Sequence, residues 1–219
     1  MKKACPWIGA ETAGFVLAGG QSQRMGTDKA ELLLGAETLI ARAVGKIQDT
    51  GLSASIAGGR RDRCARVPVI QDEGGGPLSG ICAALELCGA HRALFLPVDQ
   101  PLMPVAALLA LLRHSSLADS SAAFFSLNGR VETFPVILRR DTLPVLRRQW
   151  TLQNRGCLAA IRAAAAEEKW PVLVASAERL AQQGLCEGDN ALPTRFWFLN
   201  INTSADLDLA QHLLRTPIG

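Results

Sequence analysis

The sequence lacks paired cysteines, long hydrophobic runs and any strong excess of charge of one sign. Its cysteines form no Cys-x-x-Cys pair and no metal-binding pattern with histidine, which argues against a disulfide framework and a zinc site; they are Cys5, Cys64, Cys82, Cys88, Cys157 and Cys186. No window approaches the roughly 18 uncharged apolar residues of a membrane span, and the first residues lack the apolar core of a signal peptide. We therefore expect a cytoplasmic protein with reduced thiols and no membrane association.

The charges are mixed along the chain. The formal net charge is +3 over 219 residues, with neither a basic arm nor an acidic tail, so a small anionic ligand is a better partner than nucleic acid. With 48% hydrophobic residues, the chain is long enough to bury roughly 70% of the surface that it exposes when unfolded. We expect residues 1–219 to form a single α/β domain.

A glycine-rich segment near the amino terminus organises the chain. The apolar run 15–18 predicts a buried strand, and Gly19-Gly20 directly after it allow the backbone to bend and to approach a ligand closely. The loop then offers the Ser22 hydroxyl, the Arg24 guanidinium, a flexible Gly26 and the Lys29 ammonium. Backbone N–H groups and two cations can thus converge on one phosphate.

Two common glycine motifs do not describe this segment. A P-loop requires Gly-Lys-Ser/Thr, whereas Gly26 is followed by Thr27-Asp28-Lys29, and Ala18-Gly19-Gly20 does not supply the Gly-x-Gly-x-x-Gly of dinucleotide-binding folds. Taken alone, the segment could also be a glycine turn in which Lys29 merely caps a solvated loop.

Strand and helix patterns alternate after this loop. Helical spacing covers 30–34 and 38–49, and strands are predicted at 52–57 and 67–70, the latter delivering Asp72 at its end. This alternation predicts a three-layer, doubly wound, mostly parallel sheet, in which ligands bind at the carboxyl ends of the strands. Asn128-Gly129 between two further strand patterns, 122–127 and 131–138, predicts an added antiparallel hairpin. Helices are expected at 105–112, 142–150 and 157–168, and a strand at 172–175.

Two more segments combine strand or helix ends with polar groups. Gly74-Gly-Gly-Pro-Leu-Ser-Gly80 precedes a predicted helix over 81–87, although such a run could be only a tight connection. The hydrophobic strand 93–98 ends in Asp99, and Pro97 should interrupt its pairing; Asp99 could also be an ordinary turn or cap residue.

The closing segment is Arg195-Phe-Trp-Phe-Leu-Asn-Ile-Asn-Thr-Ser-Ala-Asp-Leu207. An apolar strand here would place Asn200 and Asn202 on one face, and Thr203 with Asp206 has the spacing of a capping box that opens a last helix. Both asparagines could instead be turn residues.

Together these segments resemble the molybdenum cofactor guanylyltransferases, a branch of the nucleotidyltransferases. Leu-Ala-Gly-Gly-x-Ser-x-Arg-Met-Gly-x-Asp-Lys, Gly-Pro-Leu-x-Gly, the aspartate of Pro-Val-Asp and Phe-x-Asn-x-Asn-Thr occur in the family's order between residues 17 and 207. The resemblance implies that Arg24, Lys29 and Asp99 serve catalysis, with Asp99 holding Mg²⁺. It implies nucleotide or cofactor contacts at Leu17, Ala18, Gly19, Gly20, Ser22, Gly26, Lys29, Asp72, Pro77, Leu78, Gly80, Asn200 and Asn202.

The implied reaction is transfer of GMP from GTP to the terminal phosphate of molybdopterin, with or without its molybdenum, and release of pyrophosphate. Leu17-Ala-Gly-Gly20 favours guanine, because pyrimidine-using relatives more often have Ala-Ala-Gly; a sister transferase using CTP or another phosphorylated acceptor is the alternative, and an idle cofactor-carrying adaptor a further one. Other proteins of cofactor biosynthesis or molybdoenzyme maturation are candidate partners.

Two features depart from the family's pattern. Phe134-Pro135 replaces a more common polar residue before proline, and Ala57-Gly58-Gly59 replaces an asparagine after the second strand. Arg155, in a loop before a helix, could hold the acceptor phosphate, or it could be a solvated surface residue.

Overall fold

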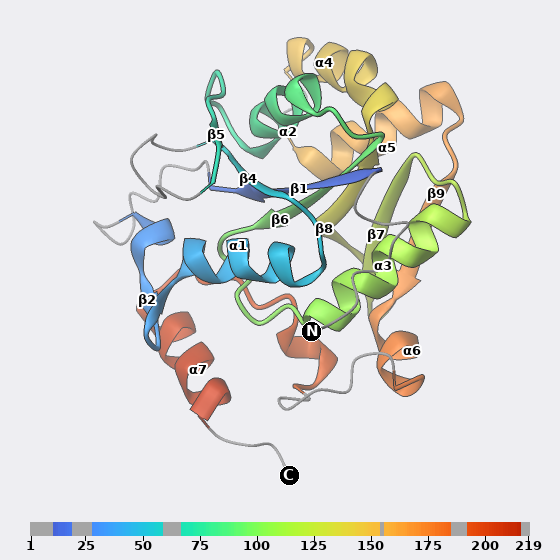
Figure 1. The fold of residues 1–219 in the computed structure, drawn as a ribbon. Helices are drawn as coiled ribbons and strands as arrows, with labels where there is room; N and C mark the ends of the chain where they lie inside the picture. The colour runs from blue at the N-terminus through green and yellow to red at the C-terminus, as the bar shows by residue number, and fades with distance from the viewer. Residues whose placement is uncertain (1–10, 19–27, 59–66, 154–155, 185–191, 216–219) are drawn as a thin grey trace.

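A seven-stranded sheet forms the centre of the computed structural model, which describes residues 11–18, 28–58, 67–153, 156–184 and 192–215 (Figure 1). The strand order is β5-β4-β1-β6-β8-β7-β9, and β8 alone of these strands runs antiparallel to its neighbours. This arrangement confirms the mostly parallel sheet with an added hairpin. The strands are β1 (Thr12–Leu17), β4 (Ala54–Ala57), β5 (Val69–Ile70), β6 (Arg92–Pro97), β7 (Ala122–Leu127), β8 (Arg130–Arg139) and β9 (Val172–Ser176).

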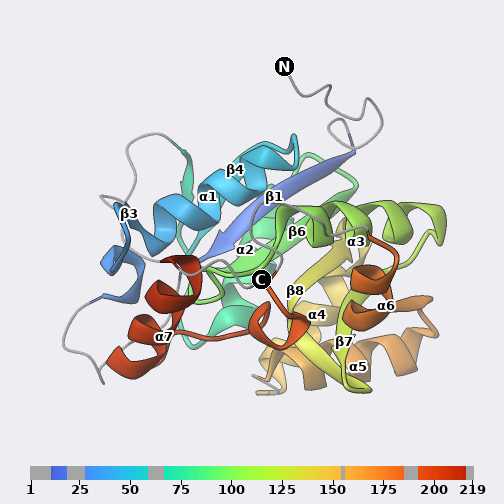
Figure 2. The same cartoon turned by 90° about the horizontal axis from the view of Figure 1, so that it is seen from below.

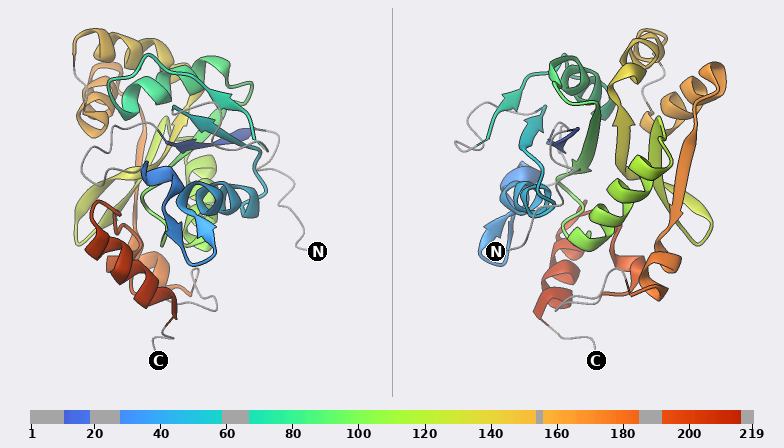
Figure 3. Two further views of the ribbon diagram at one scale, coloured as in Figure 1. Left: turned by 90° about the vertical axis from the view of Figure 1, so that its left-hand side faces the viewer. Right: turned by 45° about the vertical axis from the view of Figure 1, so that its right-hand side comes forward.

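Helices cover both faces of the sheet, as the doubly wound prediction requires (Figures 1 and 3). They are α1 (Leu39–Asp49), α2 (Pro77–Leu87), α3 (Val105–Leu117), α4 (Leu143–Thr151), α5 (Cys157–Glu168), α6 (Ala177–Gln182) and α7 (Ser204–Arg215). Helices α1 and α3 pack on one face, and α2, α4 and α5 lie on the other. No helix among the described residues is long and apolar enough to cross a membrane.

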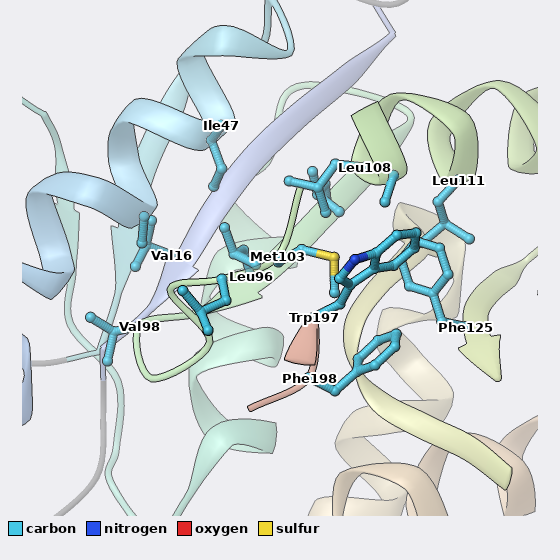
Figure 4. Close-up of a cluster of buried hydrophobic side chains, with 14 of the residues drawn as sticks. Val16, Ile47, Leu96, Val98, Met103, Leu108, Leu111, Phe125, Trp197 and Phe198 are labelled. Carbon is cyan, nitrogen blue, oxygen red and sulfur yellow. The ribbon is translucent and has the colours of Figure 1, made fainter. Parts of the chain in front are cut away.

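The central strands β1 and β6 are mostly apolar because both of their faces are buried. On the α1 and α3 face, Val16 and Leu96 pack with Ile47 and Leu108 (Figure 4). On the opposite face the rings of Phe15 and Phe95 stack with their centroids 5.5 Å apart. Neighbouring residues of one strand thus serve two separate cores, one on each face of the sheet.

Short elements flank the sheet. They are the 3-10 helices η1 (Lys29–Glu31), η2 (Arg140–Thr142) and η3 (Thr194–Phe196), and the hairpin of β2 (Leu33–Leu34) and β3 (Glu37–Thr38). Figure 2 shows α7 beside this small hairpin. The helix predicted at 30–34 is therefore wrong beyond its first turn, because Gly35, with φ of 69°, reverses the chain into the β2–β3 hairpin.

The strand predicted in the closing segment is also wrong. Residues 194–196 form η3, and both Trp197 and Phe198 after it are buried, whereas alternation in a strand would send one of them outward. The Trp197 indole N–H donates to the Leu192 carbonyl at 2.8 Å, which satisfies its polar atom inside the core. The apolar run therefore reflects insertion into the core and not sheet pairing.

The short helix α6, which follows β9 directly, was not predicted from the sequence.

The predicted hairpin at Asn128-Gly129 is confirmed. Both residues have positive φ, 50° and 74°, as a tight two-residue turn between twisted strands requires. Strand β8 pairs with β6 only over its last residues, from Phe95↔Val136 to Arg92↔Arg139. The first half of β8 consequently extends past the end of β6, at the edge of the sheet where Asp99 lies.

We predict opposite effects for alanine at two glycines. A Cβ at Gly14 would lie 2.2 Å from Cγ2 of Ile47, whereas a Cβ at Gly45 in α1 meets nothing within 4 Å. Gly14→Ala should therefore lower the free energy of unfolding by about 1–3 kcal/mol through overpacking, and Gly45→Ala should raise it by about 0.5–1 kcal/mol. Urea unfolding of both variants tests this, and shifts of the same sign would contradict the close packing of β1 against α1.

Candidate active site at the strand ends

The carboxyl ends of β1, β4, β5 and β6 meet at one edge of the sheet, where doubly wound folds bind their ligands. Main-chain hydrogen bonds continue beyond the strands and fix their ends to one another. These bonds run from Val98 N to Leu17 O at 3.1 Å, from Ala18 N to Ala57 O at 3.1 Å and from Gly58 N to Ile70 O at 2.9 Å. The loops that carry Asp72 and Asp99 therefore start from a fixed frame.

Lys29 lies between two other predicted site residues. Its ammonium is 3.5 Å from Oδ2 of Asp99 and donates to Oδ1 of Asn202 at 2.6 Å. The Asp28 carboxylate accepts from Ala30 N at 3.1 Å and so caps the short helix η1 that begins with Lys29. Three residues far apart in the chain are thus brought together around one cation.

The Asp99 carboxylate stands partly shielded from water, with its side chain 25% exposed. Burial raises its pKa above the ordinary 3.8, while the Lys29 ammonium acts in the opposite direction. Strand β6 ends at Pro97, two residues before Asp99. The interruption of pairing predicted at Pro97 is absent on the β1 side, where Pro97 pairs with Leu17, whereas pairing with β8 stops at Phe95. The Asp99 carbonyl also accepts from Ile201 N at 2.9 Å, which ties its backbone to the closing segment.

A single carboxylate suits Mg²⁺, which commonly binds one or two protein carboxylates together with substrate phosphates and water. Among the described residues, no group of three or more His, Cys, Asp or Glu side chains could form an all-protein metal cage. The donor set at Asp99 therefore fits an ion that arrives with a phosphate ligand.

A second group of predicted residues adjoins the ends of β1 and β4. A Cβ placed on Gly80 would lie 3.4 Å from Oδ2 of Asp72, 3.6 Å from Cδ2 of Leu17 and 3.7 Å from the carbonyl carbon of Ala57. Four chain segments thus meet at Gly80, and one of them is the main chain at Ala57.

The turn before α2 depends on glycine. Gly74, Gly75 and Gly76 have φ of 76°, 92° and 122°, and Gly74 N donates to Oδ1 of Asp72 at 3.2 Å. Pro77 then begins α2 and is exposed. Leu78 is fully buried in the core.

The remaining predicted residues divide into two groups. Asn200 donates to the Phe198 carbonyl at 3.3 Å, and with no strand in this segment the expected common face with Asn202 does not exist. Outside the described residues lie Gly19, Gly20, Ser22, Arg24, Gly26 and Arg155.

Sequence reasoning missed Lys46, whose ammonium donates to the Met103 carbonyl at 2.6 Å. Met103 closes the loop that carries Asp99, so this bond fixes the far end of the loop to α1. The available signal was a lysine directly beside the apolar stripe of α1, which contains Val44 and Ile47.

Comparison with known proteins agrees with the fold. The fold is similar to that of molybdopterin-guanine dinucleotide biosynthesis protein A from Archaeoglobus fulgidus, with a TM-score of 0.73 and 22% sequence identity. The superposition covers 93% of this chain and 98% of that protein. The fold is that of the nucleotidyltransferases. Residues 14–176 match the MobA-like NTP transferase domain, and the chain belongs to this family.

Two curated relatives show the extent of the sequence similarity. The molybdenum cofactor guanylyltransferase of Rhizobium johnstonii is 36% identical over 59% of this chain and 66% of its own length, just under two thirds. The probable molybdenum cofactor guanylyltransferase of Opitutus terrae is 32% identical over 73% of this chain and 88% of its own.

We predict a pH-dependent contribution of Lys46 to stability. Burial, followed by the nearby Arg42 guanidinium, lowers the pKa of Lys46 from 10.5 to about 8. Between these values the unfolded chain binds the extra proton, so raising the pH favours the folded state. The difference in unfolding free energy between wild type and Lys46→Met should rise over this interval, by at most about 1.4 kcal/mol per pH unit. Urea titrations of both proteins from pH 7.5 to 10.5 measure it, and a flat difference would contradict the lowered pKa.

Proposed function

We propose that this protein transfers GMP from GTP to the terminal phosphate of molybdopterin, giving the guanine dinucleotide and pyrophosphate. The observation that carries the proposal is the Lys29 ammonium beside Asp99 and Asn202 at the strand-end edge of a MobA-like domain. The names of the curated relatives support guanylyl transfer to molybdenum cofactor in particular.

The reaction is a displacement at the α-phosphorus of GTP. An oxygen of the acceptor phosphate forms the new P–O bond, and the bond to the β-phosphate oxygen breaks, so that pyrophosphate leaves with the bonding electrons. The attacking oxygen is already anionic, and no protein side chain has to remove a proton. Positioning of the substrates and neutralisation of their charge are then the main tasks of the site.

Cations supply this neutralisation. At about 4 Å and an effective dielectric constant near 20, one charge pair is worth about 4 kcal/mol, so Lys29 and Arg24 match the scale of the repulsion between two phosphates. Asp99 would hold Mg²⁺, which, when bound, screens phosphate charge and stabilises the pyrophosphate leaving group. The Lys29 ammonium would remain beside the Asp99 carboxylate and donate a hydrogen bond to a phosphate oxygen.

The donor nucleotide is assigned to the side of the sheet formed by β1, β4 and β5. Asp72, Leu17, Ala57 and Gly80 adjoin there, and the Asp72 carboxylate can accept hydrogen bonds from the ring N–H and amino groups of guanine. The glycine loop 19–26 directly follows β1 and would hold the phosphates through its N–H groups, with Ser22 adding a hydroxyl.

The acceptor is assigned to the other side of Asp99. The first half of β8 extends beyond β6 at this edge, which makes the β7–β8 hairpin a wall for the pterin end of the molecule. We further infer that residues 1–219 act as one domain. We also infer that the reaction takes place in the cytoplasm, because Cys82, Cys88 and Cys157 are free thiols, as is usual in a reducing compartment.

Asp99→Asn and Lys29→Met should each lower kcat for GMP transfer by about 10²–10³-fold, because the first removes the carboxylate that would hold Mg²⁺ and the second removes a cation beside the phosphates. Asp208→Asn, an exposed carboxylate on α7, is the control and should leave kcat unchanged. Incubation with GTP, Mg²⁺ and molybdopterin, followed by mass analysis of the dinucleotide, measures the effect. Wild-type turnover in Asp99→Asn would contradict the metal site, and no pyrophosphate release by the wild type would favour an idle adaptor.

GTP should raise the melting temperature more than CTP at equal concentration, because a ligand that binds only the folded state stabilises it more the tighter it binds. Asp72→Asn should remove most of the difference between the melting-temperature shifts caused by GTP and by CTP. It should keep the shift that both nucleotides cause through their phosphates. A thermal shift assay with Mg²⁺ measures both effects. A larger shift with CTP would favour the sister cytidylyltransferase.

A further inference from the structure

The Asp206 carboxylate in the first turn of α7 accepts more hydrogen bonds than a helix cap requires. Its Oδ2 accepts from Thr203 N at 2.8 Å and from the Thr203 hydroxyl at 2.9 Å, and Asp206 N donates to that hydroxyl oxygen at 3.2 Å. These contacts confirm the predicted capping box. In addition, the same Oδ2 accepts from the backbone N–H of Asn202 at 2.9 Å.

This additional bond reaches the candidate active site through two short paths. The Asn202 side chain accepts from the Lys29 ammonium at 2.6 Å, and the neighbouring Ile201 N–H donates to the Asp99 carbonyl at 2.9 Å. The three residues 201–203 therefore contact both Lys29 and Asp99 while their backbone is held by Asp206. Among the described residues, residues 201–203 belong to neither sheet, so they are not held by strand pairing.

We propose that Asp206 is a positioning residue for phosphoryl transfer, which acts through the backbone of Asn202 to hold the Lys29 ammonium beside Asp99. The inference rests on the proposed function for its kinetic consequence, but the contact chain from Asp206 to Lys29 is independent of the substrate. The hydrogen bonds from Asn202, followed by those from Thr203, also hold the pKa of Asp206 below its usual value.

Capping and positioning can be separated, because the Thr203 hydroxyl bonds to Asp206, whereas the bond to Asn202 N comes from the Asp206 carboxylate itself. Thr203→Ala removes the cap hydroxyl and leaves the Asp206 carboxylate on Asn202 N, whereas Asp206→Ala removes both functions. Asp206→Ala should lower kcat about tenfold or more, as misplacement of a reacting group does, with a smaller change in KM for GTP. Thr203→Ala should keep kcat within about twofold while lowering the melting temperature to a similar extent. Asp206→Glu, whose carboxylate can also reach back to the cap, should restore much of the rate.

The decisive measurement is the double variant with Lys29→Met. If Asp206 acts through Lys29, Asp206→Ala should add little to the loss of kcat already caused by Lys29→Met, because changes in one contact network are not additive. Fully additive losses would show that Asp206 serves the fold alone and would overturn the proposal.

A second readout needs no substrate. Acetylation of Lys29 by acetic anhydride, followed by peptide mass spectrometry, should be several-fold faster in Asp206→Ala than in Thr203→Ala, because only the former releases Asn202 from its fixed backbone. Equal labelling in the two variants would overturn the positioning role even if kcat falls. An inactive wild type with the expected labelling pattern would instead refute the proposed reaction and leave the contact chain intact.

Discussion

The site depends on one electrostatic constraint, the placement of the Lys29 ammonium between oxygens from two distant parts of the chain. Asp99 is 70 residues away and Asn202 is 173 residues away, so folding of nearly the whole chain is needed to form these contacts. Burial disfavours the charged form of the Asp99 carboxylate, and the Lys29 ammonium offsets this cost only in part. The pair places a positive and a negative group side by side at the strand-end edge of the sheet.

The strands supply the rigidity that this arrangement requires. Main-chain hydrogen bonds continue past the ends of β1, β4 and β6, so the loops leave the sheet from fixed positions. Lys46 then holds the far end of the Asp99 loop at Met103, and Asp206 holds the closing segment at Asn202. Polar groups outside the immediate site thus restrain the loops on which its charged residues lie.

The strands of the large sheet could be predicted from the sequence, whereas the conformation of the closing segment, residues 195–207, could not. Apolar runs such as 93–98, together with Asn128-Gly129, specify strands and a turn through local preferences, and these were predicted correctly. The run 196–199 has the same composition, yet Trp197 and Phe198 insert into a core built by other elements, which no local pattern reveals.

The site shows the same division between local signals and tertiary contacts. That Lys29, Asp99 and Asn202 would meet was expected from the resemblance to a known family. The roles of Lys46 and Asp206 depend on hydrogen bonds to single backbone atoms, Met103 O and Asn202 N, and residue type and spacing alone do not identify them.

The turn formed by Gly74, Gly75 and Gly76 has a consequence for the evolution of this family member. A Cβ at Gly74 or Gly76 would meet no atom within 4 Å, so the surroundings leave room for larger side chains. The positive φ angles nevertheless disfavour every residue with a Cβ. Mutational drift is therefore limited here by backbone conformation and not by crowding, whereas the flanking Asp72 and Pro77 lack this positive-φ restriction.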